Sequence, residues 1–265
     1  MRVQTWIRAA DKVVNCIIWV VICILLLYSG LGLWDTYSVY RGAENSELIY
    51  KYKPSGEGAN PSLKELQKLN PDVCAWLTVD NTKIDYPIVQ GKTNMEYINK
   101  AVDGSFSLSG SLFLDYRNER NFHDFYSLIY GHHMAGNVMF GILPSFQKKE
   151  FFESHTSATL FLPDSTKKIE IFACVYTDAY DSIVFNPKCN DADARTKVLN
   201  RIREKAVRYR DKELKDGDRI VGFSTCYNTT TNGRIIVFGR FVLVKLFGNT
   251  LFGNHALYRN SIGVI

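Results

Sequence analysis

The sequence lacks the short motifs that mark most metal and nucleotide sites. None of its 265 residues falls within a CxxC, an HExxH or a glycine-rich phosphate loop, and we therefore expect neither a metal ion nor a cofactor. It also has no run of five or more basic residues, and its formal net charge is +5. This mild positive balance does not favour nucleic-acid binding.

Cysteine is scarce and irregularly spaced. The six cysteines are at positions 16, 23, 74, 174, 189 and 226. Their separations match neither a metal site nor the framework of a disulfide-rich domain. Cys74 and Cys174 lie within apolar runs, where a free cysteine usually behaves as a small core residue. A disulfide between Cys174 and Cys189 is the alternative to two free thiols.

The longest apolar run is near the N-terminus. Val13 to Leu33 contains no charged residue, and at about 1.5 Å per residue a helix of this length is roughly 30 Å long, enough to cross a bilayer's hydrocarbon core. Three basic residues and one acidic residue precede the run, which favours a cytoplasmic N-terminus. Trp34 and Asp35 follow where a signal peptide would have a small-residue cleavage site. The sequence predicts a single-pass type II membrane protein with its folded part on the extracytoplasmic face; a buried soluble helix is the alternative.

The chain divides into five parts on this basis. Ser55 to Pro61 is rich in glycine and small polar residues, which predicts a boundary between the anchor and the folded domain. The expected parts are a cytoplasmic tail (1–12), a transmembrane helix (13–33), a juxtamembrane helix and linker (34–60), the folded domain (61–246) and a C-terminal tail of unassigned role (247–265).

The folded domain is predicted to be mainly β, with helices at its start. Ser62 to Leu69 has leucines at helical spacing, with Ser62 as the expected N-cap. Short apolar runs separated by turn residues then predict a barrel or sandwich. The expected strands are Ala75–Val79, Tyr86–Val89, Gly110–Leu114, Tyr126–Tyr130, Thr159–Leu162, Lys168–Thr177, Asp218–Thr225 and Arg234–Val244. Ala192 to Asp211 carries apolar residues on one helical face, which predicts an amphipathic helix inserted before the last two strands.

Three residues could together catalyse acyl transfer. Cys226 ends one apolar run and Arg234 begins the next, so the two would be close if these runs pair as a hairpin. His132 follows a further apolar run and a glycine. A cysteine, a histidine and an arginine can supply the nucleophile, the proton carrier and a cation for the developing oxyanion.

These features together resemble the sortases. The resemblance consists of the N-terminal anchor, the Tyr130–Met134 segment (YGHHM), the Ser224–Cys226 segment (STC) and an arginine shortly after it. The stretches Leu66–Leu77 and Asp85–Gln90, and the inserted helix, resemble class B in particular. The resemblance implies a closed sortase β-barrel and a membrane-bound cysteine transpeptidase of Gram-positive bacteria.

The resemblance also assigns roles to individual residues. Cys226 matches the nucleophile, His132 the catalytic histidine and Arg234 the arginine at the scissile carbonyl. Substrate-contacting positions of class B sortases match Asn94, Tyr130 and Ser224. His133 and Arg240 are the alternatives for the histidine and the arginine. His133 is adjacent to His132, so the two side chains face opposite ways on a strand, and Arg240 is farther along the run from Arg234.

The activity implied is cleavage of a C-terminal sorting signal, NPxTx-like, in a secreted protein. The threonine is transferred through a thioacyl-enzyme to an amine of the peptidoglycan precursor lipid II or of a pilin. Three alternatives are an L,D-transpeptidase-like enzyme, a hydrolytic thiol peptidase and a non-catalytic membrane-anchored scaffold. The L,D-transpeptidase signature has glycine directly before the cysteine and arginine two residues after it, whereas Thr225 and Asn228 occupy these positions.

Overall fold

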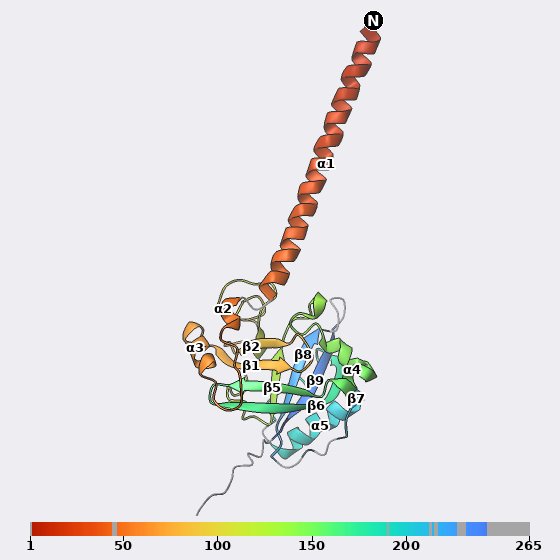
Figure 1. Cartoon of the computed structure of the whole chain (residues 1–265). Coiled ribbons are helices and arrows are strands. Elements are labelled where there is room, and N and C mark those ends of the chain that lie inside the picture. The colour runs from red at the N-terminus through yellow and green to blue at the C-terminus, as the bar shows by residue number, and fades with distance from the viewer. Residues whose placement is uncertain are drawn as a thin grey trace, which may run out of the picture.

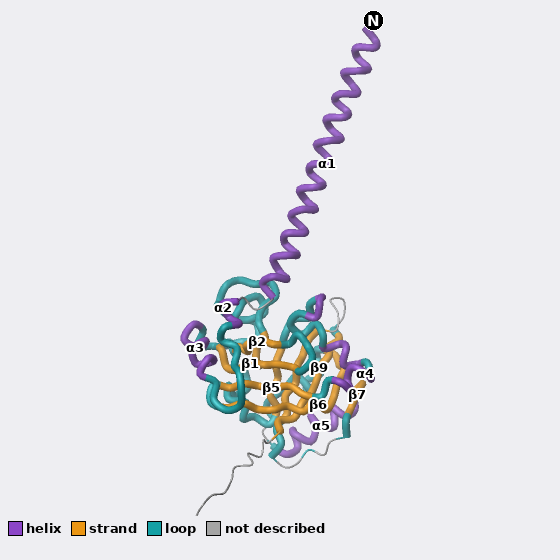
Figure 2. The backbone as a smooth tube through the Cα atoms, viewed as in Figure 1, coloured by secondary structure: helices purple, strands orange, loops and turns teal. Residues whose placement is uncertain are grey.

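A computed structural model shows a β-barrel carried on one long N-terminal helix (Figures 1 and 2). It describes residues 2–43, 47–189, 191–211, 214, 217–226 and 232–242. The predicted C-terminal tail (247–265) and the polar segment that follows Cys226 (227–231) lie outside the described residues. The elements before the barrel are α1 (Arg2–Ala43), α2 (Glu47–Tyr50) and α3 (Pro61–Leu69).

Helix α1 contains the whole uncharged run predicted to cross a membrane. It projects away from the barrel as a single rod (Figure 1), and its apolar part from Trp6 to Tyr37 is long and apolar enough to span a bilayer. None of this part is buried against the rest of the chain. Such a helix has its apolar side chains available to lipid, which makes α1 a candidate membrane anchor.

Eight strands close into a barrel. They are β1 (Val73–Val79), β2 (Asp85–Val89), β3 (Leu112–Leu114), β4 (Tyr126–Tyr130), β5 (Ser157–Leu162), β6 (Ser165–Asp178), β8 (Ile220–Cys226) and β9 (Gly233–Val242). Their order around the ring is β5-β1-β2-β3-β4-β8-β9-β6, and a β5–β6 pairing closes it. The β2–β3 and β4–β8 pairs are parallel and the others antiparallel. This confirms the predicted closed barrel and all eight predicted strands, with shifts of a few residues at their ends.

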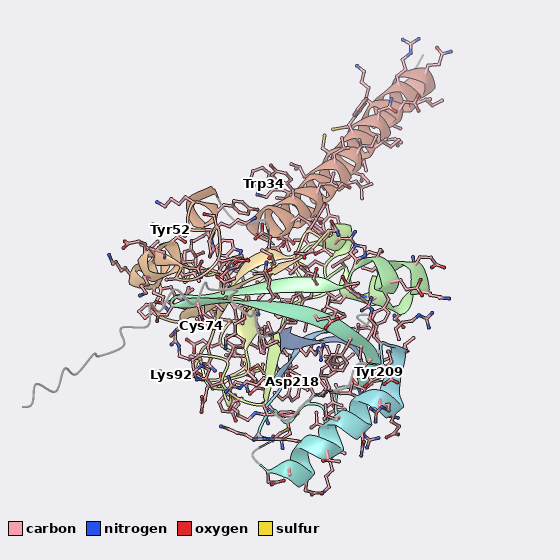
Figure 3. The ribbon with its side chains drawn as sticks, turned by 60° about the horizontal axis from the view of Figure 1, so that its bottom comes forward. Trp34, Tyr52, Cys74, Lys92, Tyr209 and Asp218 are labelled. Atoms are coloured by element: carbon pink, nitrogen blue, oxygen red, sulfur yellow. The ribbon has the colours of Figure 1, made fainter. Side chains whose placement is uncertain are left out.

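Alternation along strand β9 divides its apolar side chains between two of the hydrophobic clusters. On β9, Ile235 and Val237 belong to the cluster inside the barrel, whereas Ile236 and Phe238 belong to an outer cluster. Helix α5 (Ala192–Lys205) covers that outer cluster with Val198 and Ile202, both buried. In Figure 3, α5 lies on the outside of the barrel beside the short strand that carries Tyr209.

The inserted helix is shorter than predicted. It ends at Lys205, and Ala206–Tyr209 form an additional strand, β7, which pairs with Ala173–Val175 of β6. Strand β5 pairs only with the first half of that β6 edge, up to Glu170, so the second half has free backbone groups for β7 to bond. Satisfying these groups outweighs the helical spacing of the apolar residues.

One smaller prediction was wrong, and one alternative left open by the sequence is excluded. Helix α3 begins at Pro61 after Asn60 rather than with Ser62 as its cap, in keeping with the preference of proline for the first helical turn. Cys174 and Cys189 are both free, so they form no disulfide. The juxtamembrane segment is helical as far as Ala43 and again in α2. The remaining helices, all between β4 and β5, are η1 (Ala135–Asn137), η2 (Leu143–Gln147) and α4 (Lys149–Ser154).

Candidate active site

The predicted hairpin between Cys226 and Arg234 is present. These residues are the last paired positions of the β8–β9 ladder, and their Cα atoms are register partners. The two strands are antiparallel, so the end of β8 and the start of β9 meet at one rim of the barrel. Arg234 is partly exposed, and its Nη1 donates to the carbonyl oxygen of Gly233 at 3.2 Å.

His132 arrives at the same rim from a strand distant in sequence. In the parallel β4–β8 ladder Tyr130 pairs with Ser224, and the N–H of Gly131 donates to the carbonyl oxygen of Ser224 at 3.1 Å. His132 follows Tyr130 by two residues, as Cys226 follows Ser224. Both residues therefore follow the last pair of this parallel ladder, toward the same end of the barrel.

The ring of His132 is held by a backbone carbonyl. Its Nε2 lies 2.7 Å from the carbonyl oxygen of Ile98, in the segment between β2 and β3. A carbonyl oxygen can only accept a hydrogen bond, so Nε2 carries a proton in this arrangement and Nδ1 is left for proton exchange. The N–H of Phe140 also donates to the carbonyl oxygen of His132 at 3.1 Å, which closes the loop after the histidine.

Gly131 is required by close packing rather than by its backbone angles. A Cβ there would lie 2.3 Å from Cδ2 of Leu112 and 2.7 Å from Cδ2 of Phe140. Real Cβ contacts are not this short, so a side chain at this position would require Leu112, Phe140 or the backbone leading into His132 to shift. The glycine thus fixes where the histidine leaves β4.

The two competing residues are in different surroundings. His133 is exposed and forms an isolated bridge with Met139. Arg240 pairs with Ile220, at the opposite end of β8 from Cys226. Its Nε and Nη2 donate to Oε2 of Glu170 at 3.0 and 2.8 Å, so its charge is engaged in an ion pair away from the rim.

The three expected substrate contacts do not form one surface. Tyr130 and Asn94 are partly exposed and lie close together, since both donate to the same oxygen of Asp115. Ser224 is only 2% exposed. It is therefore buried next to Tyr130, its partner in the β4–β8 ladder, and does not share the partly exposed position of Tyr130 and Asn94.

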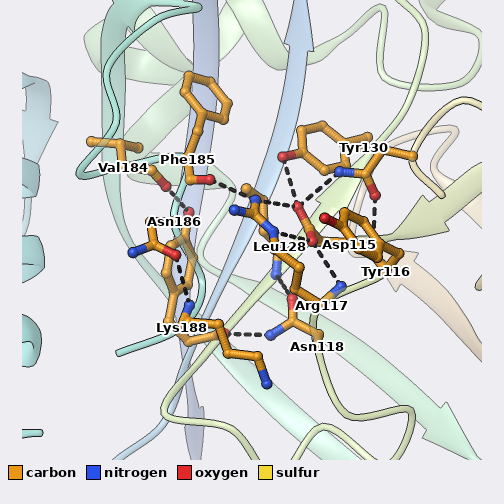
Figure 4. Close-up of polar contacts among 12 residues, drawn as sticks. Asp115, Tyr116, Arg117, Asn118, Leu128, Tyr130, Val184, Phe185, Asn186 and Lys188 are labelled. Atoms are coloured by element: carbon orange, nitrogen blue, oxygen red, sulfur yellow. Dashed lines mark hydrogen bonds and ion pairs between the residues drawn. The ribbon is translucent and has the colours of Figure 1, made fainter. Parts of the chain in front are cut away.

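Sequence reasoning missed Asp115, whose side chain is fully buried at the centre of this arrangement (Figure 4). Arg117 donates to both its oxygens, from Nε to Oδ1 at 2.9 Å and from Nη2 to Oδ2 at 2.8 Å. Burial opposes ionisation, but the hydrogen bonds and charge of Arg117 outweigh it and lower the pKa of Asp115. The signal in the sequence is a carboxylate directly after the apolar residues of β3, with an arginine two positions later.

The remaining thiols outside α1 are unsuited to attack. Burial raises the pKa of Cys74 and of Cys174 to about 12 and that of Cys189 to about 11. Among the described residues, no group of three or more His, Cys, Asp and Glu side chains is arranged to hold a metal ion. Outside α1, Cys226 is therefore the thiol left as a candidate nucleophile.

Comparison with known proteins gives consistent similarities. The chain is 32% identical over 219 residues to Sortase B of Listeria monocytogenes, covering 80% of this chain and 89% of that protein. It is 54% identical to a Streptococcus pyogenes class B sortase involved in pilus biogenesis, with a TM-score of 0.63 over 68% of this chain and 97% of that one. The sortase B from the Type II pilus of Streptococcus pneumoniae is 38% identical, with a TM-score of 0.58 over 67% and 97% of the two chains. No family model matches the chain.

Proposed function

This chain belongs to the class B sortases, which are cysteine transpeptidases acting on proteins that carry a sorting signal, and we propose that Cys226, His132 and Arg234 are its catalytic residues. The observation that supports the proposal is twofold: Cys226 pairs with Arg234, and the parallel β4–β8 ladder ends at Tyr130 and Ser224, two residues before His132 and Cys226. Three strands supply the three groups that thiol acyl transfer needs.

The proposed reaction cleaves an NPxTx-like signal after its threonine. Nδ1 of His132 takes the proton of the Cys226 thiol, and the sulfur attacks the threonine carbonyl carbon. The guanidinium of Arg234 stabilises the oxyanion, the peptide C–N bond breaks, and His132 returns the proton to the leaving amine. A thioester between Cys226 and the threonine remains.

An amine then resolves the thioester. The incoming nitrogen attacks the same carbonyl carbon and gives a proton to His132, a new amide forms, and the sulfur leaves as a thiolate that regains the proton. The candidate acceptors are an amine of the lipid-linked wall precursor and an amine of a pilin. A relative that is 54% identical is involved in pilus biogenesis, and this likeness favours the pilin amine.

We also propose that α1 anchors the enzyme with its N-terminus in the cytoplasm. The uncharged run and the basic residues before it support this orientation, which would place the rim outside the cytoplasm, where secreted substrates are found. Digestion of right-side-out cells by an added protease tests this: the barrel should be degraded, and its protection would exclude the orientation.

Mass spectrometry of one reaction mixture tests the chemistry. The full chain in detergent is incubated with an NPxTx-like peptide, with and without a pilin lysine peptide or an oligoglycine. We expect slow hydrolysis in water alone and a new amide when an acceptor is present, formed faster with the lysine peptide. Only hydrolysis with every amine would indicate a thiol peptidase, and preference for oligoglycine would favour wall attachment.

A further inference from the structure

Asp115 is a buried carboxylate that the proposed chemistry does not use. It directly follows β3, and its N–H donates to the carbonyl oxygen of Leu128 in β4 at 2.8 Å. Its side chain has no exposed surface, and a buried carboxylate is costly unless it is paired and fully hydrogen-bonded. The hydrogen-bond partners of Asp115 therefore indicate its function.

Three side chains converge on one oxygen. Oδ2 of Asp115 accepts from Oη of Tyr130 at 3.1 Å, from Nδ2 of Asn94 at 3.0 Å and from Nη2 of Arg117 at 2.8 Å. Two of these donors, Tyr130 and Asn94, are the partly exposed residues expected to contact the substrate. The third, Arg117, neutralises the carboxylate and keeps it an acceptor.

This geometry determines which hydrogen bonds Tyr130 can still make. A phenol has one O–H donor and two acceptor lone pairs. The O–H of Tyr130 is already used in the hydrogen bond to Asp115. Arg117 also lies within hydrogen-bonding range of the Tyr130 oxygen, which leaves one lone pair as an acceptor toward a ligand. Its ring is held between Phe113 and Phe185, with centroid distances of 5.3 and 6.4 Å.

The orientation of the Asn94 amide is fixed by the same network. Its Oδ1 accepts from the N–H of Tyr116 at 2.9 Å, and its Nδ2 donates to Asp115. If the Asn94 amide were flipped, its NH₂ would face the N–H of Tyr116 and its oxygen would face the carboxylate of Asp115. Both contacts are repulsive, so the hydrogen bonds select one orientation. One N–H of Asn94 remains for a ligand.

Arg117 extends the network to a third segment. Besides Asp115, its Nη2 donates to the carbonyl oxygen of Phe185 at 2.7 Å (Figure 4). Phe185 lies between β6 and α5, so the ion pair ties this connection to the β3–β4 side of the site. The backbone that carries the ring stacked on Tyr130 is thereby tied to the network.

We propose that Asp115 is a positioning residue that sets the hydrogen-bonding polarity of the peptide site, with Tyr130 presented as an acceptor and Asn94 as a donor. An extended peptide offers both complementary groups, a backbone N–H for Tyr130 and a backbone carbonyl for Asn94. This inference rests on the proposed function, because it takes the ligand to be the sorting peptide. Preorganising such groups before binding reduces what must be ordered when the substrate arrives.

The test combines substitutions with changes to the peptide backbone. Asp115→Asn keeps the shape of the side chain but removes its charge. The donors of Tyr130, Asn94 and Arg117 would then face either an NH₂ group or a neutral oxygen. Replacing each peptide N–H in turn by an ester oxygen removes one donor at a time. The assay uses the full chain in detergent. In the wild type, we expect the ester at one position to raise KM about tenfold, as for one lost hydrogen bond. In Asp115→Asn and in Tyr130→Phe, the same ester should no longer raise KM.

A matched control separates positioning from general stability. Glu170→Gln also removes a carboxylate from an arginine pair, the one with Arg240 far from the rim, and should retain the ester penalty. Asp115→Asn should raise KM more than it lowers kcat, and it should cost little more when combined with Tyr130→Phe. An unchanged ester penalty in Asp115→Asn, or additive losses in the double variant, would overturn the inference.

A substrate-independent measurement keeps the two proposals distinct. Asp115→Asn should increase amide hydrogen exchange in residues 183–188 relative to Glu170→Gln, while alkylation of Cys226 by iodoacetamide stays unchanged. If the wild-type chain processes no sorting peptide, the proposed function fails. Unchanged exchange in residues 183–188 of Asp115→Asn would then overturn the role of Asp115 as well.

Discussion

Nε2 of His132 donates to the carbonyl oxygen of Ile98 at 2.7 Å. The bond joins the proposed proton carrier to a segment between β2 and β3 that contains no other proposed catalytic residue. It fixes both the orientation of the ring and the nitrogen that is free to exchange a proton. Anything that displaces the Ile98 carbonyl should therefore reduce catalysis.

Gly110 offers a way to displace that carbonyl. A Cβ at Gly110 would lie 2.2 Å from the Ile98 oxygen, and the backbone φ there is +59°. We expect Gly110→Ala to lower kcat/KM at least tenfold, because a well-placed acid–base group contributes about 10²–10⁴ in rate, and to alter the pH–rate profile. Gly104→Ala is the matched control, since Gly104 also has positive φ (+88°) but its Cβ would meet only Cε of Lys100 at 3.9 Å. Equal losses in both variants, with equal Tm values, would argue against a role for the Ile98 carbonyl.

Removing the proposed nucleophile should abolish turnover without unfolding the barrel. A serine hydroxyl is a much poorer nucleophile than a thiolate, so Cys226→Ser and Cys226→Ala should both be inactive toward a sorting peptide. Circular dichroism and Tm should match those of the wild type. Substantial cleavage by Cys226→Ala would rule out the proposed mechanism.

Thiol labelling should be selective. Cys74, Cys174 and Cys189 are buried, and their pKa values are raised to about 12, 12 and 11. Brief treatment with iodoacetamide at neutral pH should leave these three unmodified and label Cys226, as read by peptide mass spectrometry. Labelling of Cys189 at the rate of Cys226 would contradict this prediction.

Arg234 should not tolerate replacement by lysine. Lysine keeps the charge but loses the planar guanidinium, and loss of an oxyanion donor costs about 10²–10³ in kcat. Arg240→Lys is the control, because Arg240 is paired with Glu170 at the far end of β8, and its activity should stay close to that of the wild type. Should Arg240→Lys be the more damaging change, the oxyanion role assigned to Arg234 is wrong.

Acid should weaken the contribution of Asp115 to the stability of the folded chain. In the folded chain the pKa of Asp115 lies below its ordinary value of 3.8. The unfolded chain therefore binds the proton more readily. The stabilisation is therefore fully present above the unfolded pKa and is lost as the pH falls through the folded pKa. In denaturant unfolding, wild type and Asp115→Asn should differ in stability by a constant amount from pH 7 to 5 and by less below about pH 4. A difference that grows on acidification would contradict the assigned pKa direction.

The sequence predicts the barrel well because strand alternation is a local pattern. All eight strands of the ring are recognisable as short apolar runs, and the pairing of Cys226 with Arg234 follows from two such runs separated by a polar segment. Strand β7 is missed because its residues also continue a helical spacing, and only the uncovered edge of β6 selects the strand. Asp115 is missed because two of its side-chain partners, Asn94 and Tyr130, come from segments remote in the sequence, and the nearby Arg117 alone does not indicate burial.

Closure of the barrel has a consequence for how the enzyme becomes active during its synthesis. Strand β4 pairs with β8, and β1 with β5, so the ring depends on contacts between residues remote in the chain. Such high contact order slows folding, because much chain entropy is lost before the pairings form. The ring is completed only by β8 and β9, the last strands described, and these carry Cys226 and Arg234 to His132. A nascent or truncated chain that lacks them has no assembled rim, so we expect no reactivity toward a sorting peptide before β8 and β9 have been synthesised and paired.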